Sequence, residues 1–263
     1  PAIFEALEES VANGDTSLSG GMKILAKNKK ARTFDIKEKY WIDVDDEKAF
    51  KKAENILLAH LKKISDGPVS RYLNRPISTR ISKYFTRKRI TPNQISSFSF
   101  SLSMIGAFFF FLGGYVNLLI GGMLAQASSI IDGCDGEIAR LKFQTSEFGG
   151  WFDAVLDRYA DAFLLFGLTC YAYLPSKNFL YLLVGFLAII GAFMNSYTAD
   201  KYDGLMKKKV VPGKHYFRMG RDVRMFIIFL GALINQPLLV LFVIAILMNV
   251  ENIRRVIIFY KNG

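Results

Sequence analysis

Two stretches in the middle of the chain, DGCDGEIAR (132–140) and GGWFDAVLD (149–157), carry its most unusual residues. They contain Asp132, Asp135, Asp153 and Asp157. Within each stretch the two aspartates are three or four residues apart, which places both on one face of an α-helix. Long apolar runs flank both stretches, and a carboxylate in a membrane helix costs about 2.5–3.5 kcal/mol on insertion scales. Carboxylates in this setting indicate a functional site.

Two pairs of carboxylates on neighbouring helices predict a site for divalent cations. Mg²⁺ takes oxygen ligands and commonly works with a substrate phosphate, and two ions can stabilise the attacking and leaving oxygens of an in-line displacement. Gly136 and Gly149 would let a ligand approach closely, and Arg140 can neutralise a phosphate. Neutralisation by Arg140, Lys142 and Arg158 without a metal is the alternative, and it would leave an excess of negative charge.

The composition indicates an integral membrane protein. Hydrophobic residues make up 51% of the 263 residues, and much of this share lies in long apolar runs. The net charge is +11, but the basic residues cluster beside the apolar runs, which favours contact with anionic headgroups or phosphate over nucleic acid. The two cysteines, Cys134 and Cys170, lie in or beside apolar runs, so we expect neither a disulfide nor a zinc site.

The apolar runs predict an all-α membrane domain over residues 91–263 with six transmembrane helices. The expected spans are 92–113, 117–140, 149–173, 178–201, 221–235 and 237–258. Thr91 is the expected N-cap of the first span, with Pro92 in its first turn. Small residues in the first two spans are expected to permit close packing: Gly106, Gly113, Gly114, Gly121, Gly122 and Ala125. Basic residues lie on one side of these spans, apart from Lys177, which predicts that both termini and the aspartates are cytoplasmic.

The first 64 residues predict a small soluble α/β fragment. We expect a helix over 3–11, a turn at 13–15, a short strand at 40–45 and a helix over 48–63 capped by the acidic run 45–47. Residues 65–90 predict a linker and an amphipathic helix lying in the membrane interface, because basic and apolar side chains alternate there. A solvated helix covering the soluble fragment is the alternative for this segment.

The aspartate stretches resemble the signature of the CDP-alcohol phosphotransferases, D-x2-D-G-x2-A-R, eight residues, then G-x3-D-x3-D. Its fixed positions are Asp132, Asp135, Gly136, Ala139, Arg140, Gly149, Asp153 and Asp157. The resemblance implies transfer of a phospho-alcohol from a CDP-alcohol to a hydroxyl with release of CMP, and a homodimer. It implies that Asp132, Asp135 and Asp153 bind Mg²⁺ or Mn²⁺, with two ions expected, and that Asp157 is the general base and a further ligand. The implied nucleotide-binding residues are Asn93, Asp132, Gly136, Ala139, Arg140, Gly149 and Asp153.

A second resemblance concerns the substrate. Residues 40–57, YWIDVDDEKAFKKAENIL, resemble the C-terminal end of sugar-phosphate nucleotidyltransferases, without the glycine-rich start that binds nucleotide. Some archaeal enzymes fuse such a domain to a CDP-alcohol phosphotransferase and join CDP-inositol to inositol 1-phosphate, giving di-myo-inositol phosphate phosphate. A phospholipid synthase with a CDP-lipid donor, such as a phosphatidylinositol-phosphate synthase, is the runner-up. A cation transporter is a remote alternative, which metal-dependent CMP release would exclude.

Basic residues at the ends of the last three spans predict a pocket for an acceptor phosphate. The candidates are Lys201, Arg218, Arg221 and Arg254. Arg221 and Arg224 share one helical face in GRDVR (220–224), which favours Arg221 as a ligand. The alternative is that these residues only anchor the cytoplasmic side of the membrane domain.

Overall fold

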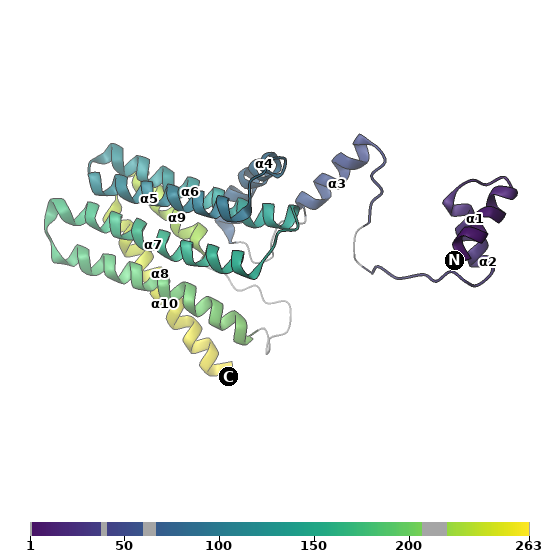
Figure 1. Cartoon of the computed structure of the whole chain (residues 1–263). Helices are drawn as coiled ribbons and strands as arrows, with labels where there is room; N and C mark the ends of the chain where they lie inside the picture. The colour runs from purple at the N-terminus through teal and green to yellow at the C-terminus, as the bar shows by residue number, and fades with distance from the viewer. Residues whose placement is uncertain (1, 38–40, 60–66, 207–219, 263) are drawn as a thin grey trace. The chain divides into compact units, whose positions relative to one another are not determined.

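Six helices lie side by side in the C-terminal part of this computed structural model (Figure 1), which describes residues 2–37, 41–59, 67–206 and 220–262. They are α5 (Pro92–Leu112), α6 (Tyr115–Leu141), α7 (Glu147–Ser176), α8 (Phe179–Met206), α9 (Arg221–Leu233) and α10 (Pro237–Asn262). Each coincides with one of the six predicted spans to within a few residues, except that α8 and α10 extend further at their C-terminal ends.

The first helix of the bundle begins and ends where local sequence requires it. Thr91 caps α5: its side chain accepts a hydrogen bond from Gln94 N, and Thr91 N donates one to the Gln94 side-chain oxygen, with Pro92 in the first turn. The helix ends at Gly113 and Gly114, whose φ angles of +70° and +78° favour glycine. These two glycines therefore form the turn to α6, and the prediction that they serve helix packing is wrong.

Close packing instead depends on glycines inside the helices. A Cβ built on Gly121 of α6 would lie 2.8 Å from the Gly106 carbonyl oxygen of α5 and 2.4 Å from the Phe110 ring. A Cβ on Gly122 would lie 2.5 Å from Ala232 of α9. The prediction for Gly106, Gly121 and Gly122 is thus confirmed. The helices enclose an apolar core of Leu, Ile, Met and Ala side chains drawn from all six.

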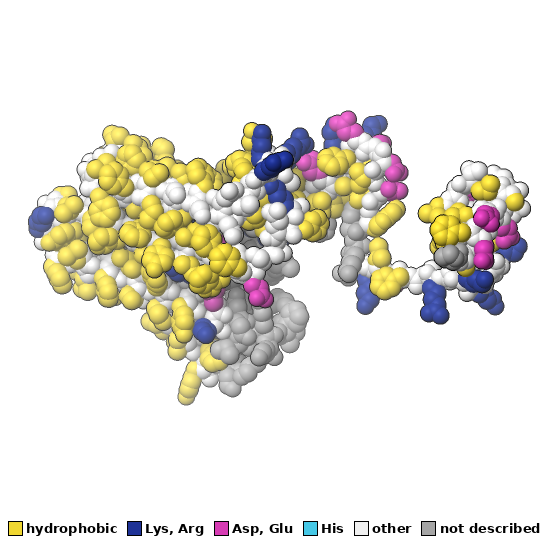
Figure 2. All heavy atoms as spheres, viewed as in Figure 1, with side chains coloured by type: hydrophobic (Ala, Val, Ile, Leu, Met, Phe, Trp, Pro, Cys, Tyr) yellow, Lys and Arg dark blue, Asp and Glu magenta, His cyan; other side chains and the backbone are white. Residues whose placement is uncertain are grey.

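Three of the described helices are long and apolar enough to cross a membrane: Pro92–Leu112, Phe179–Lys201 and Pro237–Lys261. The helices α6 and α7 contain the aspartate stretches, and α9 has only 13 residues, or about 20 Å at 1.5 Å per residue. Hydrophobic side chains cover most of the visible face of the bundle (Figure 2). Phe108, Phe166 and Phe186 of the bundle have exposed fractions of 58%, 48% and 60%. Such exposure is expected for a surface that faces lipid.

The segment before the bundle packs its polar side inward. A five-residue π-helix, η1 (Ser70–Asn74), continues into α4 (Arg75–Thr86), and α4 packs against α6. Arg75, Ser78 and Ser82 are buried there, whereas Tyr72 and Tyr84 are exposed. Lysine and arginine side chains gather around α4 (Figure 2). Contact with the bundle argues against the solvated-helix alternative, and the interfacial position remains a prediction.

Residues 1–53 form a separate compact unit. It contains α1 (Ala2–Ala12) and α2 (Leu18–Lys27), and α3 (Glu47–Ala59) begins in it. The Asp46 side chain caps α3 by accepting a hydrogen bond from Ala49 N at 2.6 Å. Residues 41–45 form no strand, and residue 40 of the predicted strand lies outside the described residues. Residues 60–63 of the predicted helix also lie outside the described residues. The predicted strand is wrong for 41–45, since the described residues include no strand to pair with it.

Candidate active site

The ends of four helices meet at one place and carry the predicted site. The N-terminal turns of α5, α7 and α9 lie beside the C-terminal third of α6. In the bundle, α5 packs against both α6 and α7, and α9 packs against α6. Asp132 and Asp135 come from α6, Asp153 and Asp157 from α7, and Arg221 from α9. Each helix also buries an apolar face in the core, which fixes where its polar end lies.

Three of the four aspartates converge. Asp132, Asp153 and Asp157 each offer a carboxylate oxygen, and the three oxygens lie within 4.8 Å of one another. The Asp153 Oδ1 atom is buried, and no described residue donates a hydrogen bond to it. Buried carboxylate oxygens normally have a partner, and three hard oxygen donors match the preference of Mg²⁺ or Mn²⁺. The residues therefore fit a divalent cation.

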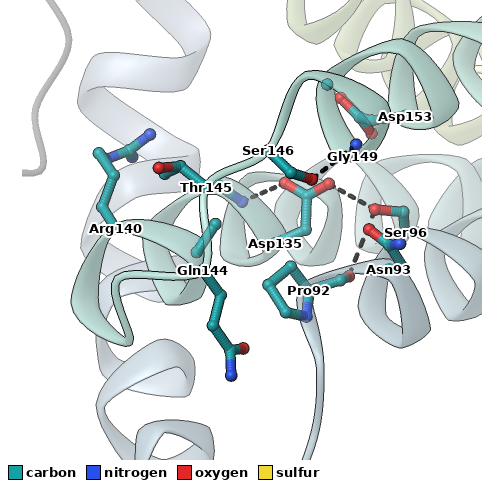
Figure 3. Close-up of a pocket in the computed structure, with 13 residues that line it drawn as sticks. Pro92, Asn93, Ser96, Asp135, Arg140, Gln144, Thr145, Ser146, Gly149 and Asp153 are labelled. Atoms are coloured by element: carbon teal, nitrogen blue, oxygen red, sulfur yellow. Dashed lines mark hydrogen bonds between the residues drawn. The ribbon is translucent and has the colours of Figure 1, made fainter.

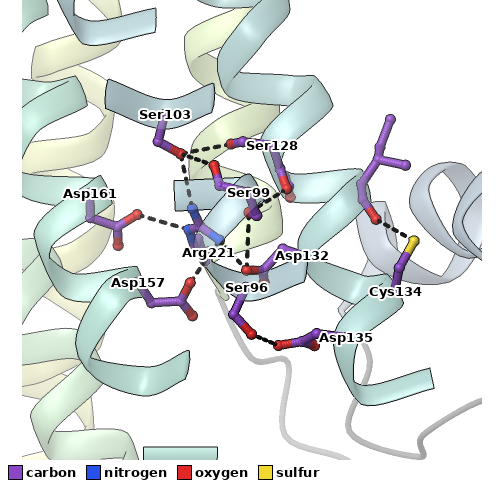
Figure 4. A network of polar contacts seen from close by, with 12 residues as sticks. Ser96, Ser99, Ser103, Ser128, Asp132, Cys134, Asp135, Asp157, Asp161 and Arg221 are labelled. Atoms are coloured by element: carbon purple, nitrogen blue, oxygen red, sulfur yellow. Dashed lines mark hydrogen bonds and ion pairs between the residues drawn. The ribbon is translucent and has the colours of Figure 1, made fainter. Parts of the chain in front are cut away.

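A row of serines on α5 contacts the two aspartates of α6 (Figure 4). Ser96 Oγ donates a hydrogen bond to Asp135 Oδ2 at 2.6 Å, and Ser99 Oγ lies 3.3 Å from Asp132 Oδ1. The other Asp135 oxygen accepts a hydrogen bond from Gly136 N. Asp135 is not one of the three residues whose oxygens converge, and both of its own oxygens accept hydrogen bonds. The serine row is a part of the site that the sequence analysis missed, although Ser96 and Ser99 are one helical turn apart.

Arg221 lies among the carboxylates (Figure 4). Its Nη1 atom is 3.0 Å from Asp132 Oδ1 and 2.7 Å from Asp157 Oδ1. Asp161, one turn beyond Asp157, pairs with Arg224 at 2.5 Å, whereas Arg158 pairs with Asp200. Asp161 is thus held by α9, through Arg224 and also through Arg221 Nε at 3.4 Å. Arg221 pairs with Asp132, Asp157 and Asp161, and Arg224 pairs with Asp161. Two positive charges therefore face three carboxylates and neutralise them only in part.

A cavity of about 190 Å³ lies between the N-terminal turns of α5 and α7 and the end of α6; we call it the α5–α6–α7 cavity (Figure 3). Six of the seven predicted nucleotide-binding residues line it: Asn93, Gly136, Ala139, Arg140, Gly149 and Asp153. Asp132 is not among its lining residues. The turn from α6 to α7 adds Gln144, Thr145 and Ser146, which the sequence analysis did not single out. Ser146 also caps α7 by accepting a hydrogen bond from Gly149 N.

A second cavity, of about 390 Å³, lies between α7, α8 and the start of α9; we call it the α7–α8–α9 cavity. Asp157, Arg158, Asp161, Arg221 and Arg224 line it. Of the predicted acceptor-phosphate residues, only Arg221 is among the described residues that do so. Lys201 is exposed and lies over the Tyr197 ring, Arg254 pairs with Glu251 at 2.7 Å, and Arg218 lies outside the described residues.

A third cavity, of about 320 Å³, lies between these two; we call it the central cavity. It shares Asp135, Gly136, Arg140 and Asp153 with the α5–α6–α7 cavity, and Asp153, Asp157, Gly220 and Arg221 with the α7–α8–α9 cavity. Its outer wall is formed by the π-helix and the start of α4, with Ser70, Asn74 and Arg75. Asp153 lines all three cavities. Two elongated ligands approaching from opposite sides would thus meet beside the converging carboxylates.

Comparison with known proteins identifies the class. Residues 89–254 match the family model described as CDP-alcohol phosphatidyltransferase, so the chain belongs to this family. The family is one of CDP-alcohol phosphotransferase enzymes, which sets aside the cation-transporter alternative. The matched residues include the whole aspartate motif and all six helices of the bundle, apart from the last turns of α10.

Curated relatives carry a more specific name. The chain is 34% identical to the "Bifunctional IPC transferase and DIPP synthase" of Aquifex aeolicus, over 99% of this chain and 59% of that protein. It is 38% identical to the protein of the same name from Thermococcus kodakarensis, over 86% of this chain and 51% of that protein. The chain therefore spans only about half to three fifths of the length of these relatives.

Solved structures show the same fold. Phosphatidylinositol phosphate synthase of Mycobacterium tuberculosis with CDP-DAG bound aligns with a TM-score of 0.58 at 18% identity, over 69% of this chain and 92% of that one. The same protein in complex with manganese and citrate aligns with a TM-score of 0.57, over 68% of this chain and 87% of that one. The chain is accordingly an integral membrane protein, and every regular element among its described residues is a helix.

Proposed function

We propose that the protein transfers a phospho-alcohol group from a CDP-alcohol to an acceptor hydroxyl and releases CMP. The observation that carries this proposal is the meeting of three cavities at Asp153, one of whose oxygens lies within 4.8 Å of oxygens of Asp132 and Asp157. The proposed donor is CDP-inositol and the proposed acceptor inositol 1-phosphate, giving di-myo-inositol phosphate phosphate. The names of the two bifunctional relatives support this choice of substrates.

Mg²⁺ or Mn²⁺ is the proposed cofactor, with Asp132, Asp135, Asp153 and Asp157 as the proposed ligands of two ions. The buried, unpartnered Asp153 Oδ1 and the three converging oxygens support this assignment. Bound cations would offset the charge that develops on the phosphate oxygens and the leaving CMP. Ser96 and Ser99 would orient Asp135 and Asp132 through their hydrogen bonds, as partners of metal ligands commonly do.

The CMP portion of the donor is proposed to occupy the α5–α6–α7 cavity. Gly136 and Gly149 present no side chain there, which leaves room for a nucleotide between two helices. Arg140 lines both this cavity and the central one, so its guanidinium can neutralise phosphate charge between them. Asn93 is proposed to contact the base, and its position on the cavity wall supports this role.

The acceptor is proposed to occupy the α7–α8–α9 cavity, with Asp157 as the general base. Asp157 lines both this cavity and the central one, so a hydroxyl approaching from α8 can lie beside its carboxylate. Arg221 and Arg224 both line this cavity, and their guanidinium groups can bind an acceptor phosphate. Arg221 also holds Asp157 at 2.7 Å, which orients the proposed base.

The remaining expectations belong to the same proposal. The protein is proposed to be a homodimer in the cytoplasmic membrane with six spans, and to have both termini and the site on the cytoplasmic side. Residues 1–64 are proposed to be the C-terminal remnant of a nucleotidyltransferase-like domain, followed by a linker and interfacial helix over 65–90 and a membrane domain over 91–263. The exposed tyrosines and basic residues around α4 support an interfacial position.

A phospholipid synthase with a CDP-lipid donor is the second candidate, since a synthase of that type shares the fold. Purified protein in detergent is therefore incubated with inositol 1-phosphate and either CDP-inositol or CDP-diacylglycerol, and CMP is measured with Mg²⁺, with Mn²⁺ and with EDTA. We expect CMP from CDP-inositol only in the presence of metal. Full turnover in EDTA would rule out the metal-dependent reaction, and CMP from CDP-diacylglycerol alone would favour the second candidate.

A further inference from the structure

We propose that Lys142 is a positioning residue for the nucleotide site. It connects two chain segments that border the α5–α6–α7 cavity, namely the link between α4 and α5 and the turn between α6 and α7. The proposal rests on the proposed function, since it takes this cavity as the site of CMP. Lys142 is the residue that ends α6; it is not among the described lining residues of the cavity, and it holds no fixed position in the aspartate motif.

The ammonium group of Lys142 binds backbone carbonyls. Its Nζ atom donates hydrogen bonds to the carbonyl oxygens of Lys88 at 2.6 Å and of Ile90 at 2.8 Å. An ammonium group has three N–H donors and can serve both carbonyls at once, and hydrogen bonds from a charged donor are stronger than neutral ones. This engagement argues against the alternative in which Lys142 neutralises the aspartates. Lys142 instead joins the end of α6 to the residues just before α5.

Both segments joined by Lys142 continue directly into the cavity wall (Figure 3). On the α5 side the wall begins two residues after Ile90, with Pro92 and Asn93. On the other side it begins two residues after Lys142, with residues 144–146. The Ile90 side chain also packs against a small apolar cluster from α5 and α6, which fixes the α4–α5 link in place. The Lys142 contacts therefore set the position of the α6–α7 turn relative to a firmly held segment.

The turn that follows Lys142 is strained and needs such support. Phe143 has a φ angle of +55°, a left-handed conformation that is unfavourable for a residue with a β-carbon. Phe143 N donates to the Arg140 carbonyl at 3.3 Å, and Gln144 N reaches back one residue further at 2.7 Å. Glycine usually occupies the position of Phe143 in this helix-ending motif. The Phe143 side chain is 87% exposed, so its packing compensates little for the strain.

The test compares nucleotide affinity with turnover. Lys142→Met removes the three N–H donors and keeps an apolar stem. Lys88→Met is the matched control, because it removes an exposed positive charge nearby and leaves the Lys88 carbonyl in place. Calorimetry gives the Kd of CDP, and kinetics with CDP-inositol give the donor KM and kcat. We expect Lys142→Met to raise Kd and donor KM about three- to tenfold. Its kcat should stay within about twofold of wild type, since the lost contact acts on binding.

Two further variants separate this role from a general loss of structure. Lys142→Arg keeps donors for both carbonyls and should recover most of the CDP affinity. Phe143→Gly in the Lys142→Met background should recover part of it, because glycine adopts a positive φ angle without strain. Thermal unfolding of each variant in detergent gives the Tm, which should change little in Lys142→Met.

Three outcomes would overturn the inference while leaving the proposed function intact. One is an equal Kd for CDP in Lys142→Met and Lys88→Met. Another is a loss of affinity that neither Lys142→Arg nor Phe143→Gly recovers. The third is a parallel fall in kcat, Tm and CDP affinity, which would show a structural role only. If the wild-type protein neither binds CDP nor releases CMP from CDP-inositol or CDP-diacylglycerol, the proposed function itself is wrong, and this role of Lys142 with it.

Discussion

Asp157 shows how one carboxylate can serve two neighbouring cavities. It lies one helical turn beyond Asp153 on α7, so both side chains reach the same group of converging oxygens. It also lines the cavity on the α8 side, where we place the acceptor. A carboxylate that only bound a metal ion would not need to line the α7–α8–α9 cavity as well. Its position therefore favours a role as base in addition to ligand.

Replacing Asp157 tests that role. General base assistance is typically worth about 10²–10⁴-fold, so Asp157→Asn should lower kcat by about that factor. CDP affinity should change much less, because Asp157 is not among the residues that line the α5–α6–α7 cavity. Steady-state kinetics and CDP calorimetry measure the two effects, and Asp35→Asn, at an exposed position outside the bundle, is the control. A near-normal kcat would assign the base to another group, with Asp161 the first to examine.

Arg221 is the residue whose expected role the structure changes most. The sequence indicated a phosphate ligand, and the structure adds direct contacts with Asp132 and Asp157. Loss of a charge-assisted phosphate contact costs about 1.5–3 kcal/mol, so Arg221→Ala should raise the acceptor KM about tenfold to a hundredfold. Arg87→Ala, at the exposed arginine that directly follows α4, is the control. If Arg221→Ala leaves acceptor KM unchanged and abolishes CDP binding, the division between donor and acceptor sites is wrong.

At the scale of elements, a buried carboxylate attaches α4 to the bundle. Glu137 is fully buried and accepts from Arg75 Nη1 at 2.6 Å, Ser78 Oγ at 2.7 Å and Ser82 Oγ at 2.6 Å. It lies two residues after Asp135, within the aspartate motif but at one of its variable positions. The helix α6, which carries two of the proposed metal ligands, therefore also holds the outer wall of the central cavity through Glu137 on another of its faces.

Glu137→Gln should weaken this attachment. Breaking a buried ion pair by removing one charge costs about 3–5 kcal/mol, because the Arg75 charge then stays buried without the carboxylate that pairs with it. We expect a lower Tm in detergent and faster proteolysis after the basic residues of α4, measured by thermal unfolding and limited trypsin digestion. Glu147→Gln, an exposed glutamate at the start of α7, should change both little. Equal behaviour of the two variants would show that the buried pair does not hold α4.

Substitution by alanine should have opposite effects on stability at two glycines. A Cβ at Gly121 would overlap the Phe110 ring and the Gly106 carbonyl, so Gly121→Ala should destabilise the bundle by about 1–3 kcal/mol. Gly150, in the first turns of α7, has nothing within 4 Å of a built Cβ, so Gly150→Ala should stabilise by about 0.5–1 kcal/mol. Thermal unfolding compares them. A Gly121→Ala variant as stable as wild type would contradict the close approach of α5 and α6.

For the whole molecule, orientation in the membrane is the expectation most open to test. The cavities lie at the end of the bundle where α6 ends and α7 begins, and the turn at Ser176 between α7 and α8 lies at the other end of α7. In a Cys170→Ser background, a cysteine at Ser176 should react with an impermeant reagent from outside intact cells. A cysteine at Gln144 should react only after permeabilisation. The reverse pattern would overturn the cytoplasmic placement of the site.

The sequence alone determined the helices and the identity of the key residues. Apolar run length and the Thr91 cap set the helix bounds, since both depend on neighbouring residues and on the membrane as solvent. The spacing of the aspartates gave the metal-binding candidates, because helical periodicity is local. The same local patterns predicted a strand at 40–45, which fails over 41–45 because a strand depends on a partner elsewhere in the chain.

Only the tertiary structure decided which charges meet. Arg221 is 64 residues from Asp157 in sequence, and Arg75 is 62 residues from Glu137, yet both pairs lie within hydrogen-bonding distance. Lys201 and Arg254 resemble Arg221 in sequence context but are not among the described lining residues of the α7–α8–α9 cavity. Such pairings depend on how helices rotate about their axes when they bury their apolar faces, and helix rotation is set by packing across the whole bundle.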